Sequence, residues 1–447
     1  MKLNITIRDG YLHRLKVLPI LLIIIGGFII IIAFLADHLG YGDSGSFGIG
    51  QFLVALTGLV LLLIGLLGKR FIKFYRDMAT LLLNMFVLLA CLELGAIIIG
   101  RSYFQIKHTA IQDLPYYAAQ DWTRTYWQEA NLTQSYHYQP YVVWRHLPFS
   151  GEMININQEG IRQTPGAECG PTAYKIFTFG GSTMLGWGSP DWGTIPAYLQ
   201  TGFAALIDRP ICVVNLGEDG YVSTQNLVAL ILQLQSGNIP DLVIFYDGIN
   251  EVIAAHESGQ SSGHVTLAKV AARFEEQEHP LITWSKASRT YSLIERWFYR
   301  SEQKRDGISP GISVDPERKF DIHHLADSVT KVYLSNYRMV RALAQEYKFD
   351  YFFFLQPHLA VGEKVLTNEE QLIRSRMDPA LADLAKAIYG NVALVSPYYK
   401  YLWNLEHIFD KETKQIWIDE VGHITPEGNQ MVAQEMLAII EKQLATK

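Results

Sequence analysis

Three long apolar runs in the first hundred residues constrain the fold more than any other feature of the sequence. They span Val17–Leu35, Phe47–Leu67 and Met78–Gly100, and the first two contain no acidic or basic side chain. Each run has about the 20 residues that a helix needs to cross a hydrocarbon core. Helices that pack on the surface of a soluble protein keep a polar face for water, which these runs lack. The runs therefore predict three transmembrane helices within residues 1–100.

The charges that flank these runs predict an orientation. Lys and Arg residues gather before the first run and between the second and third, whereas the loop between the first and second has none. Positively charged loops stay in the cytoplasm. We therefore expect an integral protein of the plasma or inner membrane, with a cytoplasmic N-terminus and with everything after residue 100 outside.

The rest of the chain alternates short apolar runs with helical patterns. Nearly continuous apolar strands that alternate with helices indicate a parallel sheet covered on both faces. Residues 171–447 are therefore predicted to form a three-layer α/β/α domain around a five-stranded parallel sheet. The predicted strands are Tyr174–Phe179, Ile211–Asn215, Leu242–Tyr246, Tyr351–Leu355 and Asn391–Val395. The predicted helices are Pro196–Ile207, Thr224–Leu234, Ala326–Tyr347, Glu369–Tyr389 and Pro426–Leu444.

Two segments depart from this alternation. Residues 101–170 are polar and aromatic, and are predicted as an extracytoplasmic linker with short strands at Tyr141–Trp144 and Met153–Asn157 joined by a turn. Residues 251–324 are polar and rich in Gly and Ser, which indicates an insertion serving as a lid or a partner surface.

Charge and cysteine content exclude several classes of protein. The net charge of −6 gives no basic footprint for nucleic acid. Three cysteines cannot form a disulfide scaffold, although Cys169 and Cys212 lie on or near neighbouring strands, where a bridge and two separate thiols are both open. The adjacent His323 and His324 lack a recognised ligand spacing, so neither a metal nor a cofactor is expected.

Residues suited to chemistry follow the predicted strands. Ligands of open α/β sheets bind at the carboxyl ends of the strands, so the turns there are where a site is expected. The turn after the first strand contains a serine at the start of a helix, where free N–H groups favour negative charge. Along the chain, the candidates are Ser182, Gly220, Asn250, Gln356, Asp419, Glu420 and His423.

Four of these turns resemble the sequence blocks of the SGNH/GDSL hydrolase superfamily. The blocks are Gly180-Gly181-Ser182-Thr183, Asn215–Gly220, Gly248-Ile249-Asn250 and His423–Asn429, in the family's order. The stretch Ile154–Arg162 is similar to the lead-in of membrane-anchored members. The resemblance implies a flavodoxin-like hydrolase domain.

The resemblance also implies a role for each matched residue. Ser182 would be the nucleophile and His423 the general base, and the backbone N–H groups of Ser182 and Gly220 would form an oxyanion hole with the Asn250 amide.

The sequence departs from the family pattern at two points. The first block reads Gly-Gly-Ser instead of Gly-Asp-Ser. The family acid lies three residues before the histidine, which is Glu420, whereas Asp419 lies four before. We favour Asp419 as the orienting acid, with Glu420 as the alternative, since the intervening Gly422 can shift the turn.

These features lead to three hypotheses for the function. The first is a membrane-anchored serine esterase that removes acyl groups from an extracytoplasmic glycan or lipid. The second is an O-acyltransferase of a cell-surface polysaccharide modification system, in which a sugar hydroxyl replaces water. The third is a non-catalytic binding module. The expected partners are the lipid bilayer, the acylated glycan or lipid, and a membrane protein that supplies acyl groups. Gln356, after the fourth strand, is predicted to contact substrate.

Overall fold

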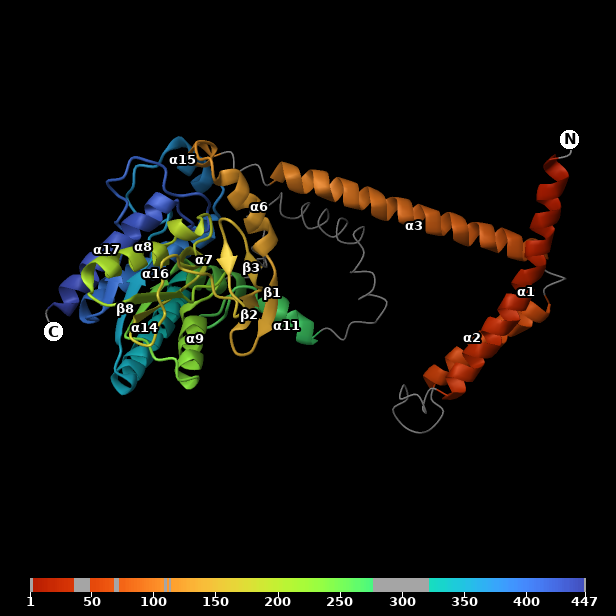
Figure 1. Cartoon of the computed structure of the whole chain (residues 1–447), viewed down its shortest axis with the longest axis horizontal. Coiled ribbons are helices and arrows are strands. Elements are labelled where there is room, and N and C mark those ends of the chain that lie inside the picture. Colours follow the sequence, from red (N-terminus) through yellow and green to blue (C-terminus); the bar gives the residue numbers. More distant parts are fainter. Residues whose placement is uncertain are drawn as a thin grey trace. The chain divides into compact units, whose positions relative to one another are not determined.

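The computed structural model describes residues 3–35, 49–67, 72–107, 111, 114–275 and 321–445. The chain divides into two compact units, Met1–Ile99 and Gly100–Lys447 (Figure 1).

The first unit is built from helices. α1 (Leu3–Leu35) contains the first apolar run, α2 (Ile49–Leu66) most of the second, and α3 (Ile72–Lys107) the third. α1 and α2 approach each other at glycines: a Cβ on Gly26 would lie 2.6 Å from the Gly58 carbonyl oxygen. Judged by the length and hydropathy that a bilayer crossing requires, none of the helices within the described residues qualifies as a membrane span.

The second unit contains a five-stranded parallel sheet with the strand order β6-β5-β7-β8-β9. Four of its strands match the predicted ones to within one residue at either end. The central strands are buried on both faces, which is why their sequences are continuously apolar. The strands are β5 (Tyr174–Gly180), β6 (Ile211–Asn215), β7 (Leu242–Asp247), β8 (Asp350–Leu355) and β9 (Leu402–Asn404).

The predicted fifth strand at Asn391–Val395 is wrong, because these residues form the end of helix α16 (Pro379–Val395). The Asp378 side chain caps this helix by accepting a hydrogen bond from the Ala380 N–H, and Pro379 occupies its first turn. Its buried residues recur at helical spacing through Val392, so the apolar run continues a helical stripe. Pro379 also divides the predicted helix Glu369–Tyr389 into α15 (Asn368–Ser375) and α16.

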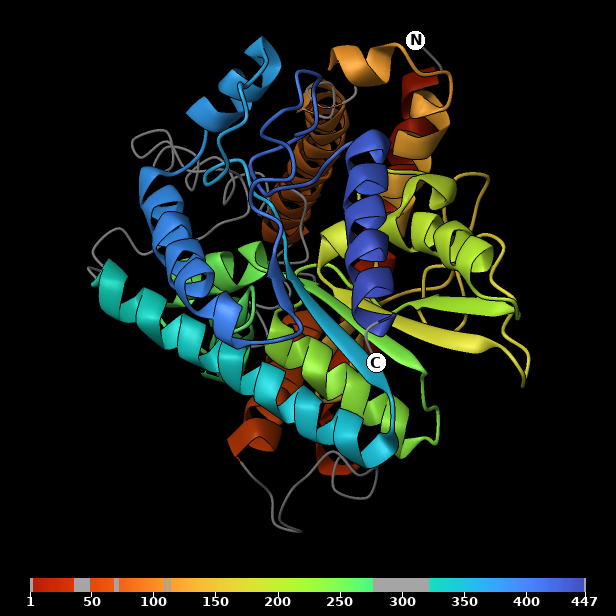
Figure 2. The same ribbon diagram turned by 90° about the vertical axis from the view of Figure 1, so that its left-hand side faces the viewer.

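Helices cover both faces of the sheet and form the three predicted layers. α8 packs against α17, whereas α9, α10 and α16 each contact α14, and in Figure 2 the two groups lie on opposite sides of the strands. Thr425 caps α17, since its hydroxyl accepts a hydrogen bond from the Gly428 N–H. The helices are α8 (Ile195–Leu206), α9 (Ser223–Gln235), α10 (Ile249–Ser258), α14 (Ile322–Tyr347) and α17 (Pro426–Leu444).

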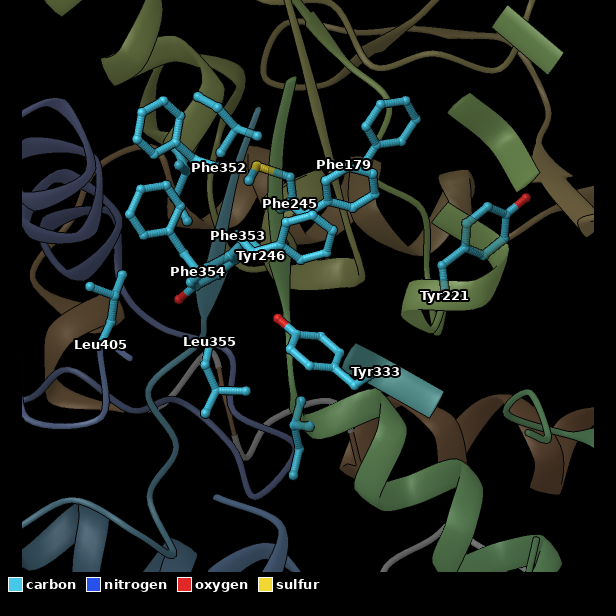
Figure 3. Close-up of a cluster of buried hydrophobic side chains, with 14 of the residues drawn as sticks. Phe179, Tyr221, Phe245, Tyr246, Tyr333, Phe352, Phe353, Phe354, Leu355 and Leu405 are labelled. Carbon is cyan, nitrogen blue, oxygen red and sulfur yellow. The ribbon is translucent and has the colours of Figure 1, made fainter. Parts of the chain in front are cut away.

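Stacked aromatic rings fix the register of the central strands (Figure 3). Phe179, Phe245 and Phe353 lie opposite one another on β5, β7 and β8, with ring centroids 5.1 and 4.4 Å apart. Tyr333 of α14 meets Phe353 edge to face. Burying each such ring contributes roughly 1.5–3 kcal/mol, and a shift by one residue would reverse every face. This register sets where the carboxyl ends of the strands meet.

The residues before the sheet form two short hairpins, whose pairing differs from the prediction. β1 (Tyr136–Gln139) pairs with β2 (Val143–His146), and β3 (Phe149–Ser150) pairs with β4 (Asn155–Ile156). The two predicted strands therefore do not pair with each other. Tyr141 has φ 70°, so it lies in the turn of the first hairpin. Two helices precede these hairpins, α5 (Pro115–Ala118) and α6 (Thr123–Thr133).

Three further features complete the second unit. Cys169 and Cys212 form a disulfide, which settles the choice that the sequence left open. The predicted insertion begins with α10 and α11 (Leu267–Glu275), and its residues 276–320 lie outside the described residues. The Asp321 side chain, near His323 and His324, accepts hydrogen bonds from their backbone N–H groups and so caps α14.

Candidate active site

Ser182 lies directly after the central strand β5, at the start of the short helix α7 (Ser182–Leu185). Glycines precede it because the chain passes close to its neighbours there. A Cβ on Gly180 would lie 2.5 Å from the Tyr246 carbonyl oxygen, and one on Gly181 would lie 2.1 Å from Asn250 Nδ2. Ser182 is partly exposed, so its hydroxyl is available to a ligand.

His423 reaches Ser182 from the loop before α17. Its Nε2 lies 2.7 Å from Ser182 Oγ, although the two residues are 241 positions apart in sequence. Its Nδ1 lies 2.5 Å from Asp419 Oδ2. A carboxylate only accepts hydrogen bonds, so this network assigns the proton to Nδ1 and leaves Nε2 to accept from the serine hydroxyl.

The loop around Asp419 explains which carboxylate meets the imidazole. Asp419 Oδ1 accepts hydrogen bonds from the backbone N–H groups of Val421, Gly422 and His423, each at 3.1 Å. Gly422 has φ 100°, a conformation that favours glycine and lets the loop close around the carboxylate. The structure thus brings Asp419 to His423 Nδ1, while the backbone carbonyl of Glu420 accepts a hydrogen bond from another residue, His358.

The electrostatics of the pair favour a charged Asp419. Burial raises the pKa of Asp419, but the charge of His423 and the hydrogen bonds to the carboxylate outweigh it, so the pKa is lowered. Burial lowers the pKa of His423, yet the attraction and hydrogen bond of Asp419 leave it above its ordinary value of 6.5. Asp219 and Glu420 add to this rise through their charge.

The other two blocks meet beside Ser182. Asn250, in the first turn of α10, donates from Nδ2 to the Tyr221 carbonyl oxygen at 2.9 Å. That oxygen would lie 3.5 Å from a Cβ on Gly181, so the loop with Gly220 and Tyr221 lies close to the serine turn. Gly220 has φ 68°, the left-handed conformation that lets the loop turn there. The three predicted oxyanion-hole residues therefore lie on neighbouring segments.

Gln356 lies at the same edge of the sheet, but it is almost fully buried. Its Oε1 lies 3.5 Å from the Thr183 hydroxyl, directly behind the serine turn. The predicted contact of Gln356 with a substrate stays a prediction, since this side chain faces protein in the structure.

Two aromatic residues near His423 were not predicted from the sequence. The Trp187 ring lies 4.6 Å from the imidazole, centroid to centroid, with 35° between the ring planes. His358 is buried and donates from Nε2 to the Glu420 carbonyl oxygen at 3.3 Å. Burial lowers the pKa of His358 to about 4, so it is neutral and holds the loop without charge. The available signal was weak: Trp187 lies between two glycines, and His358 follows a strand end.

The lead-in stretch Ile154–Arg162 contributes to the site through a buried ion pair. Arg162 Nε lies 2.8 Å from Asp191 Oδ1, and Asn155 donates to the other oxygen of the same carboxylate. The guanidinium also donates to the carbonyls of Gly186 at 2.8 Å and Ser189 at 2.7 Å. Arg162 thus fixes the chain that follows α7.

No group of three or more His, Cys, Asp or Glu side chains within the described ranges is arranged to hold a metal ion. The donors at the site are a hydroxyl, an imidazole and one carboxylate in a hydrogen-bonded chain. This arrangement is suited to proton transfer and nucleophilic attack.

Comparison with sequence models of protein families gives no match, and comparison with curated proteins gives none either. Solved structures with similarity include a lipolytic protein of the G-D-S-L family from Veillonella parvula, at 11% identity over 59% of this chain and 96% of that chain, with TM-score 0.31. A lipase/acylhydrolase from Enterococcus faecalis has 12% identity over 60% and 96%, with TM-score 0.31. An acetyl xylan esterase has 17% identity over 59% and 98%, with TM-score 0.32. The likeness is weak, so the function has to be argued from the site itself.

Proposed function

We propose that this chain is a serine esterase of the SGNH type that works through an acyl-enzyme. The observation that carries the proposal is the hydrogen-bonded chain from Ser182 Oγ to His423 Nε2 and from His423 Nδ1 to Asp419 Oδ2, at 2.7 and 2.5 Å. A serine hydroxyl becomes a nucleophile when an adjacent base takes its proton and a third group orients that base.

The proposed reaction begins with attack of Ser182 Oγ on the ester carbonyl carbon, while the hydroxyl proton moves to His423 Nε2. The C–O bond to the alcohol then breaks, and the alcohol leaves with the proton from Nε2. Water attacks the acyl-serine in the same way and gives a proton to His423 Nε2. The bond between the acyl carbon and Ser182 Oγ then breaks, Nε2 returns the proton to Oγ, and the carboxylic acid leaves. Asp419 stabilises the imidazolium in both steps but keeps its own charge.

The negative charge on the carbonyl oxygen would be bound by the N–H groups of Ser182 and Gly220 and by the Asn250 amide. Asn250 Nδ2 carries two hydrogens, and the Tyr221 carbonyl takes one of them. The second is then available for the oxyanion. Ser182 also lies at a helix start, where unpaired N–H groups favour negative charge.

We further propose that the first unit anchors the enzyme in a membrane, with the catalytic unit outside. The proposal rests on the three apolar runs and their flanking charges. None of the described helices meets the length and hydropathy that a bilayer crossing requires. Large apolar side chains on the helices are exposed, such as Phe28 at 62% and Phe86 at 69%, which is unfavourable in water. Close packing of helices at glycines, as at Gly26 and Gly58, is typical of membrane helices.

An extracytoplasmic location makes acylated glycans or lipids the proposed substrates. The acyltransferase hypothesis uses the same acyl-enzyme with a sugar hydroxyl in place of water. A chain loaded with a labelled acyl group separates the two, because an esterase releases the label into water and a transferase passes it to an added glycan acceptor.

The experiment that tests the proposal treats the full chain in detergent with a fluorophosphonate probe and locates the adduct by mass spectrometry. We expect a single adduct on Ser182 and none in the Ser182→Ala variant. A folded wild-type chain that takes no label would refute an activated serine and leave the binding-module hypothesis.

A further inference from the structure

The indole of Trp187 lies against the His423 imidazole in a tilted ring contact. The ring centroids are 4.6 Å apart and the planes are tilted by 35°, an arrangement closer to stacked than to edge-to-face. Asp419 and Ser182 occupy the two edges of the same imidazole through its nitrogens. Trp187 therefore meets the one reacting side chain whose charge changes in the proposed reaction.

The backbone around Trp187 is held from several sides. The Trp187 N–H donates to the Ser182 carbonyl oxygen at 2.9 Å, so the indole and the nucleophile belong to one turn. The next residue, Gly188, donates its N–H to the Tyr126 hydroxyl and accepts from the Tyr117 hydroxyl, both at 2.6 Å. Both tyrosines are buried.

Gly188 must be a glycine for this arrangement. Its φ is 86°, and a Cβ there would lie 2.4 Å from Ile418 Cδ1, next to the loop that carries Asp419. Arg162 binds the carbonyls on either side of Gly188, at Gly186 and Ser189.

The indole itself is also fixed. The Trp127 ring lies 5.1 Å from it at 68°, an edge-to-face contact that limits rotation of Trp187. Tyr117 belongs to α5, and Tyr126 and Trp127 belong to α6, so residues far outside the sheet set the position of Trp187.

We propose that Trp187 is a positioning residue of the active site, whose indole face aligns the His423 imidazole with Ser182 and stabilises the imidazolium formed when His423 takes the serine proton. The proposal rests on the acyl-enzyme function argued above. In that step the Oγ–H bond breaks, the proton binds Nε2, and a positive charge appears on the imidazole. A cation over an indole face is attracted by the ring quadrupole, most strongly where water is excluded.

Other charged groups also shift the pKa of His423, and their effects have to be distinguished from the effect of Trp187. Asp419 and Glu420 belong to the same loop, and Asp219 belongs to the loop after β6. His358, from the loop after β8, reaches the site through the Glu420 carbonyl and is neutral. These groups are unchanged when only the indole is replaced. Loss of the indole also reduces burial, which by itself would raise the pKa of His423, so a fall in that pKa reports on the attraction between the indole and the imidazolium.

The test measures the rate constant for fluorophosphonate labelling of Ser182 against pH, on the full chain in detergent. The variants are Trp187→Leu, which removes the π-face, and Trp187→Phe, which keeps a smaller one. We expect Trp187→Leu to slow labelling by about 2- to 30-fold at the plateau and to move the acidic midpoint down by about 0.5–1.5 pH units. Trp187→Phe should lie between Trp187→Leu and the wild type.

A purely structural role for Trp187 predicts a different result, namely a lower plateau with a midpoint that is unchanged or raised by the loss of burial, and this would overturn the proposal. If Trp187→Leu does not fold, 5,7-difluorotryptophan at position 187 weakens the quadrupole without changing the shape, and the midpoint should again fall. An unchanged midpoint with the fluorinated residue would equally refute the proposal. Absence of any labelling in the wild type would instead refute the esterase function, so the two failures are distinguishable.

Discussion

Replacing Asp419 by Asn changes one atom of the proposed triad and leaves its loop intact. The Asn carbonyl can occupy the Oδ1 position and still accept the three backbone hydrogen bonds that close the loop. The amide nitrogen then faces His423 Nδ1 in place of Oδ2. Because an amide NH₂ only donates, it stabilises the tautomer with the proton on Nε2, which cannot accept a proton from Ser182.

The expected loss is about 10⁴-fold in kcat, or about 5.5 kcal/mol in the barrier, the size that a wrong histidine tautomer causes in a serine triad. A second effect follows from the charge. Asp419 raises the pKa of His423 more than any other group does. Without its charge, burial lowers that pKa. The residual activity should therefore persist to lower pH than the activity of the wild type.

The assay is steady-state hydrolysis of p-nitrophenyl acetate by the full chain in detergent, with the melting temperature of each variant as a check on folding. Glu420→Gln is the matched control, since it removes the neighbouring carboxylate and should keep kcat within about tenfold of the wild type, the scale of a screened charge. Equal losses in the two variants, or an Asp419→Asn variant that keeps more than a tenth of the activity, would refute the assignment of Asp419.

Three further predictions test other parts of the site and the fold. Asn250→Ala should lower kcat by about 10²–10³-fold, the typical cost of one oxyanion donor, while the chain still folds by circular dichroism; unchanged turnover would exclude Asn250 from the mechanism. Activity should fall with decreasing pH through a midpoint above 6.5, because a raised pKa keeps His423 protonated, and therefore unable to act as a base, up to that pH; a midpoint below 6.5 in a pH–rate profile would contradict this. Replacing Cys169 and Cys212 by Ser should reduce the free energy of unfolding by about 4 kcal/mol for a loop of 43 residues, and a urea denaturation curve that does not move would contradict this.

The sheet was predictable wherever burial acts on both faces of a strand. Four strands are apolar almost throughout, namely β5, β6, β7 and β8. A short apolar run bounded by turn residues is best explained as a strand buried on both faces. The fifth strand failed because the apolar run Asn391–Val395 fits a helical stripe as well as a strand. The true edge strand β9 has only three residues, too few to show a period.

The candidate site was predictable for a topological reason. Parallel strands place their carboxyl ends at one edge, so Ser182, Asn250 and the loop of Gly220 come together whatever their separation in sequence. Which acid meets His423 depended on how the chain turns at Gly422, and spacing alone could not decide it.

Contacts made from outside the sheet followed no local pattern. Tyr126 and Gly188 are 62 positions apart, and Arg162 and Asp191 are 29 apart, with no period that links them. Their sequence signals are single polar or aromatic residues in a segment that composition describes as a linker. Only the folded chain shows that their hydrogen bonds converge on one turn.

These hydrogen bonds indicate that α5 and α6 belong to the catalytic unit. Tyr117 and Tyr126 are buried in a cluster that also contains Ile418, the residue directly before Asp419. The same two hydroxyls hold Gly188, six residues after Ser182. The loop of Asp419 and the turn after Ser182 are therefore both held by contacts with α5 and α6. Removing these helices would leave buried backbone groups without partners at the serine turn. A sheet with its strand-end residues is thus an incomplete site, and the segment before residue 171 has to be kept in any chain on which the proposed activity is measured.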